Sequence, residues 1–180
     1  MRAYEKLLLG LLVLICVAYA MLNSITINTV GVSLPTDPCF VIFNHPCPYV
    51  DVSIADKFIR RQRRTKPTYI LVEYPHSIAH QVFTLAMSND TITMPAHAKK
   101  KTTDKIVQQL KNGNNVAAFY ARHKQQHGLF WAMLDTNIPT YTVRIENTSW
   151  HVEPVEYDKD MDVAQIRAVV RRQLGYESRT

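Results

Sequence analysis

A histidine and an aspartate lie close together after a short apolar run, within the segment FNHPCPYVD at 43–51. The run at 39–43 is bounded by turn residues and is typical of a buried strand, and Asp51 begins a pattern typical of an amphipathic helix. Functional sites of α/β sheets gather where strands end. At such a position His45 can act as a general base on a hydroxyl, and the Asp51 carboxylate can hold the imidazole in the needed tautomer. The alternative is a surface histidine beside an aspartate that only caps a helix.

Cys47 offers a second chemistry in the same loop. A thiolate assisted by a histidine and an acid can form an acyl enzyme. However, Cys47 lies only two residues from His45 and is flanked by prolines, and side chains so close along the chain rarely meet. We therefore favour a small, partly buried residue at this position, without a nucleophilic role.

The elements that would position these residues alternate between strands and helices. Strands are expected at 25–33, 39–43, 68–74, 91–94, 116–120, 140–145 and 151–157. Helices are expected from Asp51, at 76–88, from a cap at Thr102 or Thr103 to Gly113, at 129–134 and at 162–175. This alternation predicts an α/β fold with a mixed central sheet flanked by helices. Pro154 indicates that the last strand lies near a sheet edge.

The segment 43–51 resembles the first motif of the glycerolipid acyltransferases, which is Asn-His-x4-Asp after a buried strand. Residues 105–145 are similar to the second half of that family, in which a helix ending in Gly precedes a strand with a Phe-Pro-Glu-Gly-x-Arg motif. The similarity extends in order over residues 40–150. It implies a glycerolipid acyltransferase-like α/β domain.

Two features depart from the family pattern. Five residues separate His45 from Asp51, and this spacing resembles the diacylglycerol-acyltransferase-like branch of the family. The third motif is degenerate, because the chain has FYARHK at 119–124, with Ala121 at the acidic position and Lys124 at the basic position.

The resemblance implies transfer of an acyl group from acyl-CoA to a hydroxyl of a glycerolipid or lysophospholipid. His45 would be the general base and Asp51 its orienting partner. Asn44, Arg122 and Lys124 would bind substrate, since Arg can hold a phosphate in a bidentate way and Lys can hold it as a point charge. Acyl-CoA would be a co-substrate, and neither a metal nor a prosthetic group is implied.

The N-terminus carries an uncharged apolar segment at 7–22, preceded by Arg2 and Lys6. As a helix it would be roughly 24 Å long, slightly short of the 30 Å hydrocarbon core of a bilayer. Three interpretations compete: a retained membrane anchor, a signal peptide cleaved after Ala20, and a buried helix of the domain. We favour the anchor, because the segment has no polar face and the resemblance implies lipid chemistry. We therefore expect a membrane helix at 1–24 and an acyltransferase-like domain at 25–180, on the endoplasmic reticulum or another intracellular membrane.

The charge pattern indicates an anionic partner. The net charge of +6 equals the number of basic residues in the acid-free run 57–66, which we expect to contact anionic headgroups of the membrane. Nucleic acid is not expected, because the one aromatic residue in that run, Phe58, belongs to the apolar stripe of the helix. The three cysteines lack Cys-x-x-Cys spacing, which argues against a zinc site or a disulfide framework.

The rival function is a catalytically degraded acyltransferase-like protein that binds lipid or a protein partner at the membrane. Ala121 is its main support, because alanine has no chemistry to offer at the acidic position of the third motif.

Overall fold

The computed structural model describes residues 3–24, 26, 28–44, 58–59, 68–73, 91–94, 99–120, 127–146, 149–158 and 160–176. The helices are α1 (Ala3–Ser24), α4 (Lys99–Lys111), α5 (His127–Thr136) and α6 (Val163–Gln173). The strands are β1 (Asn28–Gly31), β2 (Phe40–Asn44), β3 (Thr68–Glu73), β4 (Thr91–Met94), β5 (Asn115–Tyr120), β6 (Thr140–Glu146) and β7 (Ser149–Pro154). Phe58 and Ile59 are also helical.

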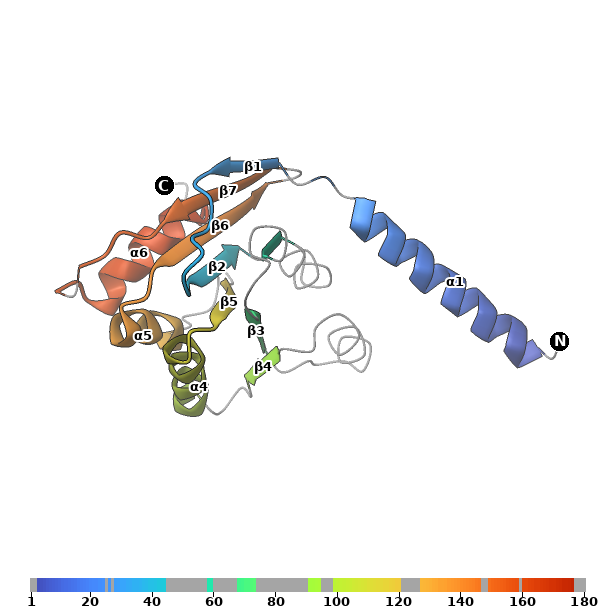
Figure 1. Ribbon diagram of the computed structural model, residues 1–180, viewed down its shortest axis with the longest axis horizontal. Coiled ribbons are helices and arrows are strands. Elements are labelled where there is room, and N and C mark those ends of the chain that lie inside the picture. The colour runs from blue at the N-terminus through green and yellow to red at the C-terminus, as the bar shows by residue number, and fades with distance from the viewer. Residues whose placement is uncertain are drawn as a thin grey trace.

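Seven strands of the described part form one mixed sheet in the order β1-β7-β6-β2-β5-β3-β4 (Figure 1). The strands from β6 to β4 in this order are parallel, β7 is antiparallel to β6, and β1 is parallel to β7. The predicted α/β fold with a mixed sheet flanked by helices is therefore confirmed. The last strand, β7, lies next to the edge strand β1, and Pro154 is its final residue.

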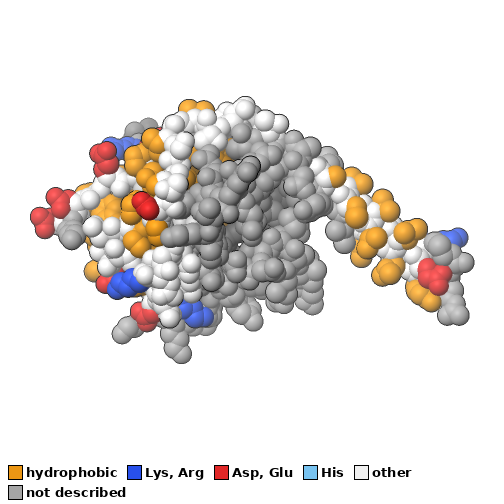
Figure 2. All heavy atoms as spheres, viewed as in Figure 1, with side chains coloured by type: hydrophobic (Ala, Val, Ile, Leu, Met, Phe, Trp, Pro, Cys, Tyr) orange, Lys and Arg blue, Asp and Glu red, His pale blue; other side chains and the backbone are white. Residues whose placement is uncertain are grey.

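The N-terminal helix α1 extends away from the sheet (Figure 1). The apolar side chains that the structure describes on this helix face solvent, as Figure 2 shows, and Leu8 and Leu14 are 68% and 69% exposed. Among the residues whose side chains the structure describes, no helix is both long enough and apolar enough to cross a membrane. The expected membrane-spanning helix at 1–24 is therefore not supported, in line with an apolar segment that falls short of the bilayer core.

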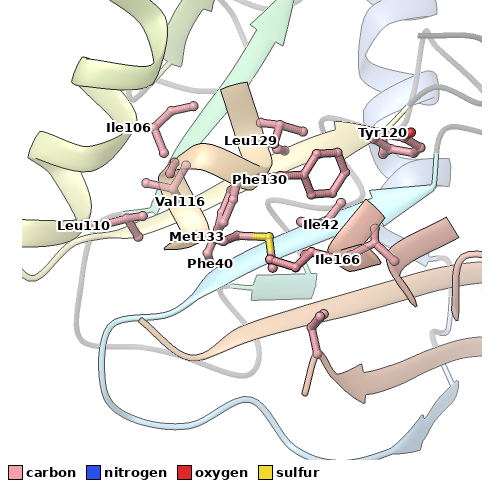
Figure 3. Close-up of a cluster of buried hydrophobic side chains, with 14 of the residues drawn as sticks. Phe40, Ile42, Ile106, Leu110, Val116, Tyr120, Leu129, Phe130, Met133 and Ile166 are labelled. Atoms are coloured by element: carbon pink, nitrogen blue, oxygen red, sulfur yellow. The ribbon is translucent and has the colours of Figure 1, made fainter. Parts of the chain in front are cut away.

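One face of the sheet is covered by α4, α5 and α6 (Figures 1 and 3). Alternate residues of the two central strands β2 and β5 point into this layer. They pack against apolar side chains of the three helices, among them Ile106, Leu110, Leu129, Phe130, Met133, Ile166 and Val170. Both faces of β2 are buried, which explains why the sequence shows a continuous apolar run there rather than an alternating one.

The opposite face of the sheet is covered by Phe58 and Ile59, which are 2% and 1% exposed. They pack in one cluster with the other set of alternate residues of β2 and β5 and with residues of β6 and β7, namely Val41, Phe43, Ala117, Val143, Trp150 and Val152. For these two residues the predicted apolar stripe of the helix that follows Asp51 is confirmed.

Local sequence signals explain most helix ends. Asp162 caps α6 as predicted, with a capping box in which Asp162 and Gln165 each accept a hydrogen bond from the other's backbone N–H at 2.8 Å. Gly113 and Gly175 follow α4 and α6 with φ of +79° and +73°, which is the glycine-favoured conformation that ends a helix. The start of α4 differs from the prediction: it begins at Lys99, because three lysines are good helix formers and extend the helix beyond the threonines.

Gly31 lets the edge strand β1 approach β7 closely. Its φ is +101°, and a Cβ atom there would overlap the carbonyl oxygen of Val152. We predict that Gly31→Ala lowers the free energy of unfolding by about 1–3 kcal/mol, because both the overlap and the left-handed backbone add strain. Denaturant unfolding measures the loss, and hydrogen exchange should show faster opening of β1. Gly10→Ala in α1 is the control, since nothing lies within 4 Å of its Cβ position; equal stability of the two variants would contradict the prediction.

Candidate functional site

The two central strands β2 and β5 end side by side. They are parallel, and their last residues, Asn44 and Tyr120, are partners in the register of the sheet. The chain then continues from Asn44 into the first predicted motif and from Tyr120 into the third. We call the edge of the sheet at which Asn44 and Tyr120 lie the site edge.

The described helical residues that follow β2 and β5 along the chain lie on opposite faces of the sheet. Phe58 and Ile59, which follow β2, pack on one face, whereas α5, which follows β5, packs on the other. Two neighbouring parallel strands whose connections diverge in this way define a topological switch point, where α/β folds form a crevice for ligands. The geometry therefore marks the site edge between β2 and β5 as the candidate site.

Of the residues predicted to do chemistry, Asn44 is the one that the structure describes. His45, Asp51, Arg122 and Lys124 lie outside the described residues, as does Cys47. The basic run 57–66 is described only at Phe58 and Ile59.

Asn44 is 8% exposed and binds the neighbouring strand through its side chain. Its Nδ2 donates to the carbonyl of Ile145 at 3.1 Å, and its Oδ1 accepts from the N–H of Ile145 at 2.7 Å. The regular pairing of β2 with β6 stops one residue earlier, at Phe43 and Val143. The amide of Asn44 thus replaces one rung of the ladder and fixes the point at which the chain leaves the sheet toward His45. Both of these bonds go to protein backbone, and the role in substrate binding that the resemblance implies for Asn44 stays a prediction.

We predict that Asn44→Ala lowers the free energy of unfolding by about 1–3 kcal/mol. The variant leaves the N–H and the carbonyl of Ile145 without their partner in a part-buried position, which costs free energy. Denaturant unfolding measures the loss. The control is Asn114→Ala, which removes a bond of 2.8 Å to Gln109 in a half-buried turn and should cost less. Equal losses of unfolding free energy in the two variants would show that the bonds of Asn44 to Ile145 stabilise the fold no more than the bond of Asn114 to Gln109 does.

An aromatic cluster lies beneath the site edge on the face of Phe58. The ring of Phe43 is 6.2 Å from that of Phe58, 5.4 Å from that of Phe119 and 6.0 Å from that of Trp150, and the Phe58 and Trp150 rings are 4.9 Å apart. Rings at these separations contribute stability beyond their buried area. The cluster holds Phe58 against β2, the strand that precedes His45 in the sequence. Trp150 was not among the residues predicted from the sequence, although a tryptophan directly before the expected strand at 151–157 was a usable signal.

Three ionisable side chains gather where β6 ends. Arg144 Nε lies 3.2 Å from a carboxylate oxygen of Glu146, and His151 Nε2 lies 3.5 Å from the other oxygen. Arg144 and His151 face each other across the β6–β7 pair, at the same end of the sheet as Asn44. All three are partly exposed, so the mutual attraction is screened by water. Sequence analysis did not single out this group, because it depends on the pairing of two strands.

The described residues also line an open hollow of about 540 Å³ at Asn137, Glu156, Tyr157, Asp158 and Met161. Asn137 precedes β6 and the other residues follow β7, so the hollow lies at the opposite edge of the sheet from Asn44. Within the part of the chain that the structure covers, no group of three or more His, Cys, Asp or Glu side chains could hold a metal ion.

The N-terminal helix joins the sheet at the site edge. The first residue of β1, Asn28, pairs with Ser149, which in turn pairs with Glu146 at the end of β6. Only residues 25–27 separate Asn28 from the end of α1 at Ser24. Four Cα–Cα steps of about 3.8 Å span at most roughly 15 Å. The end of α1 therefore lies within about 15 Å of Asn28, which is at the same end of the sheet as the last residues of β2 and β5.

Comparison with known proteins leaves the family of the chain open: no family model matches it, and no curated protein matches it.

Proposed function

We propose that the chain is a membrane-bound O-acyltransferase that moves an acyl group from acyl-CoA to a hydroxyl of a glycerolipid or lysophospholipid. The observation that carries the proposal is the switch point between β2 and β5. The two segments that resemble family motifs are far apart in the sequence, yet each continues from one of two neighbouring strand ends, Asn44 and Tyr120. A shared catalytic crevice requires this arrangement of the strands.

The proposed chemistry uses side chains that follow these strand ends. His45 takes the proton of the acceptor hydroxyl as its oxygen attacks the thioester carbonyl carbon, and Asp51 orients the imidazole. The carbon–sulfur bond then breaks, and coenzyme A leaves as a thiol with the proton from His45. Arg122 and Lys124 hold a phosphate of the substrates. Acyl-CoA is consumed as a co-substrate, and the steps require no metal or prosthetic group.

Attachment to a membrane, at the endoplasmic reticulum or another intracellular membrane, is part of the same proposal. The exposed leucine and valine side chains of α1 support it, because burial of such surface in lipid is favourable by about 25 cal/mol per Å². The tether at 25–27 supports it further, since it joins α1 to the site edge, where a lipid acceptor would enter. The basic run 57–66 would add contact with anionic headgroups.

A degraded relative that binds lipid or a protein partner remains the second candidate, because Ala121 stands at the acidic position of the third motif. One experiment separates the two: full-length chain in lipid nanodiscs is incubated with radiolabelled palmitoyl-CoA and a set of lysophospholipid and diacylglycerol acceptors. We expect label in the lipid product of at least one acceptor. Binding of palmitoyl-CoA without transfer to any acceptor would favour the degraded relative, and the absence of both would contradict the proposed function.

A further inference from the structure

Tyr120 is a fully buried tyrosine at the site edge. It is the last residue of β5 and 0% exposed. Its ring lies 5.7 Å from that of Phe130 in α5 and 6.1 Å from that of Tyr176 after α6. The hydroxyl of Tyr176 donates to the carbonyl of Tyr120 at 3.0 Å. Contacts on both the ring and the backbone therefore hold this side chain in one place.

The Tyr120 hydroxyl has no hydrogen-bond partner among the described residues, although it is buried. Two other tyrosines packed against the same core behave differently. The hydroxyl of Tyr157 donates to the carbonyls of Met133 and Ile138 at 3.1 and 3.3 Å, and that of Tyr176 donates to Tyr120. An unpaired buried hydroxyl costs about 1–3 kcal/mol, and such exceptions in a native protein call for an explanation.

The position of the Tyr120 hydroxyl indicates which chemical group could accept its hydrogen bond. Tyr120 is the register partner of Asn44, which directly precedes His45. Figure 3 shows the hydroxyl oxygen on the side of the ring that points away from Phe130 and the rest of the apolar cluster. The ring that carries the hydroxyl is packed among apolar side chains, and burial of this kind penalises a charged partner such as phosphate more than a neutral carbonyl oxygen.

We propose that the Tyr120 hydroxyl donates a hydrogen bond to the carbonyl oxygen of the bound acyl thioester; this inference rests on the proposed function. When the acceptor oxygen bonds to the carbonyl carbon, an electron pair moves onto the carbonyl oxygen, and it returns when the carbon–sulfur bond breaks. A donor fixed beforehand stabilises that oxygen most while it carries the charge. Tyr120 is thus a catalytic residue at a place where the family motif has a proline, which has no side-chain donor.

The test is Tyr120→Phe in the full-length chain. We expect kcat for acyl transfer to fall by about 10²-fold with little change in the KM for palmitoyl-CoA. The temperature of unfolding should stay the same or rise, because the variant removes an unpaired hydroxyl. Unchanged kcat would overturn the inference while leaving the proposed function intact.

Tyr157→Phe is the matched control. The pKa of Tyr157 is raised, because the effect of burial outweighs the opposing effect of a hydrogen bond with Thr140. The phenol is therefore neutral at physiological pH and can donate a hydrogen bond. Its loss should lower stability and leave kcat unchanged, which is the reverse of the pattern expected for Tyr120→Phe.

A binding measurement tests the inference even without turnover. Palmitoyl-CoA should raise the unfolding temperature of the wild-type chain more than S-hexadecyl-CoA, which lacks the carbonyl oxygen, and Tyr120→Phe should abolish this difference. Suppose that Tyr120→Phe abolishes the difference between the two compounds but no acyl transfer to any acceptor is detected. This result would support the contact with the carbonyl oxygen and contradict the proposed enzymatic activity. Equal shifts by the two compounds in wild type, including no shift at all, would overturn the contact.

Discussion

Replacing His45 with alanine is expected to slow acyl transfer by about 10²- to 10⁴-fold, the range that a positioned proton transfer contributes. Without the imidazole, no side chain removes the proton of the acceptor hydroxyl as its oxygen attacks the thioester. The initial rate of transfer from labelled palmitoyl-CoA, at saturating acceptor, measures the effect. Because His45 follows the buried strand β2 directly, the unfolding temperature of the variant should be recorded beside the rate.

His151→Ala is the matched control for His45→Ala. His151 lies at the same end of the sheet on β7, is partly exposed, and pairs with Glu146 at 3.5 Å. Its loss should leave the rate unchanged, since His151 has no role in the proposed reaction and a partly exposed contact of this kind contributes little to stability. Equal rates for wild type and His45→Ala across all acceptors would identify the chain as a binding protein rather than an enzyme.

Removing residues 1–24 is expected to release the domain from membranes. Among the side chains that the structure describes, neither apolar core contains a residue of α1, so the sheet and its helices should remain folded. The truncated chain should bind vesicles only through the run 57–66, at about 1 kcal/mol per basic residue near an anionic surface. Flotation with phosphatidylcholine vesicles, with and without phosphatidylserine and at low and high salt, measures this directly.

The salt dependence distinguishes the two contributions. The full-length chain should float with neutral vesicles at high salt, because apolar burial is not screened. The truncated chain should float only with anionic vesicles at low salt. Full-length protein that stays in solution with neutral vesicles would contradict attachment through α1, and a mature chain beginning after Ala20 would favour the signal peptide instead.

Local sequence patterns predicted those helices and strands whose bounds depend on nearby residues, such as apolar runs and helix caps. The apolar runs at 39–43, 116–120 and 140–145 became β2, β5 and β6, and Asp162 and Gly175 flank α6 as expected. The order of the strands could not be read in the same way. It depends on pairings between distant segments, such as β1 with β7, that leave no local periodic signal.

The candidate site was only partly predictable for the same reason. The sequence indicated that the site follows two strand ends. That these strands, β2 and β5, are neighbours and so form a switch point became evident only from the strand order of the sheet. The two hydrogen bonds between Asn44 and Ile145 connect residues 101 positions apart and could not be inferred from spacing, while the substrate-binding role that the resemblance implies for Asn44 stays a prediction. The roles of His45, Asp51, Arg122 and Lys124 stay predictions, since these residues lie outside the described part of the chain.

The most direct test of the proposed site is the distance between the His45 imidazole and the Asp51 carboxylate in a crystal structure of the full-length chain. We predict a nitrogen–oxygen separation of about 2.6–3.2 Å at the site edge, within hydrogen-bond reach despite the extra residue between the two. Side chains that lie on opposite sides of the site edge would contradict the acyl-transfer mechanism, whatever the fold around them.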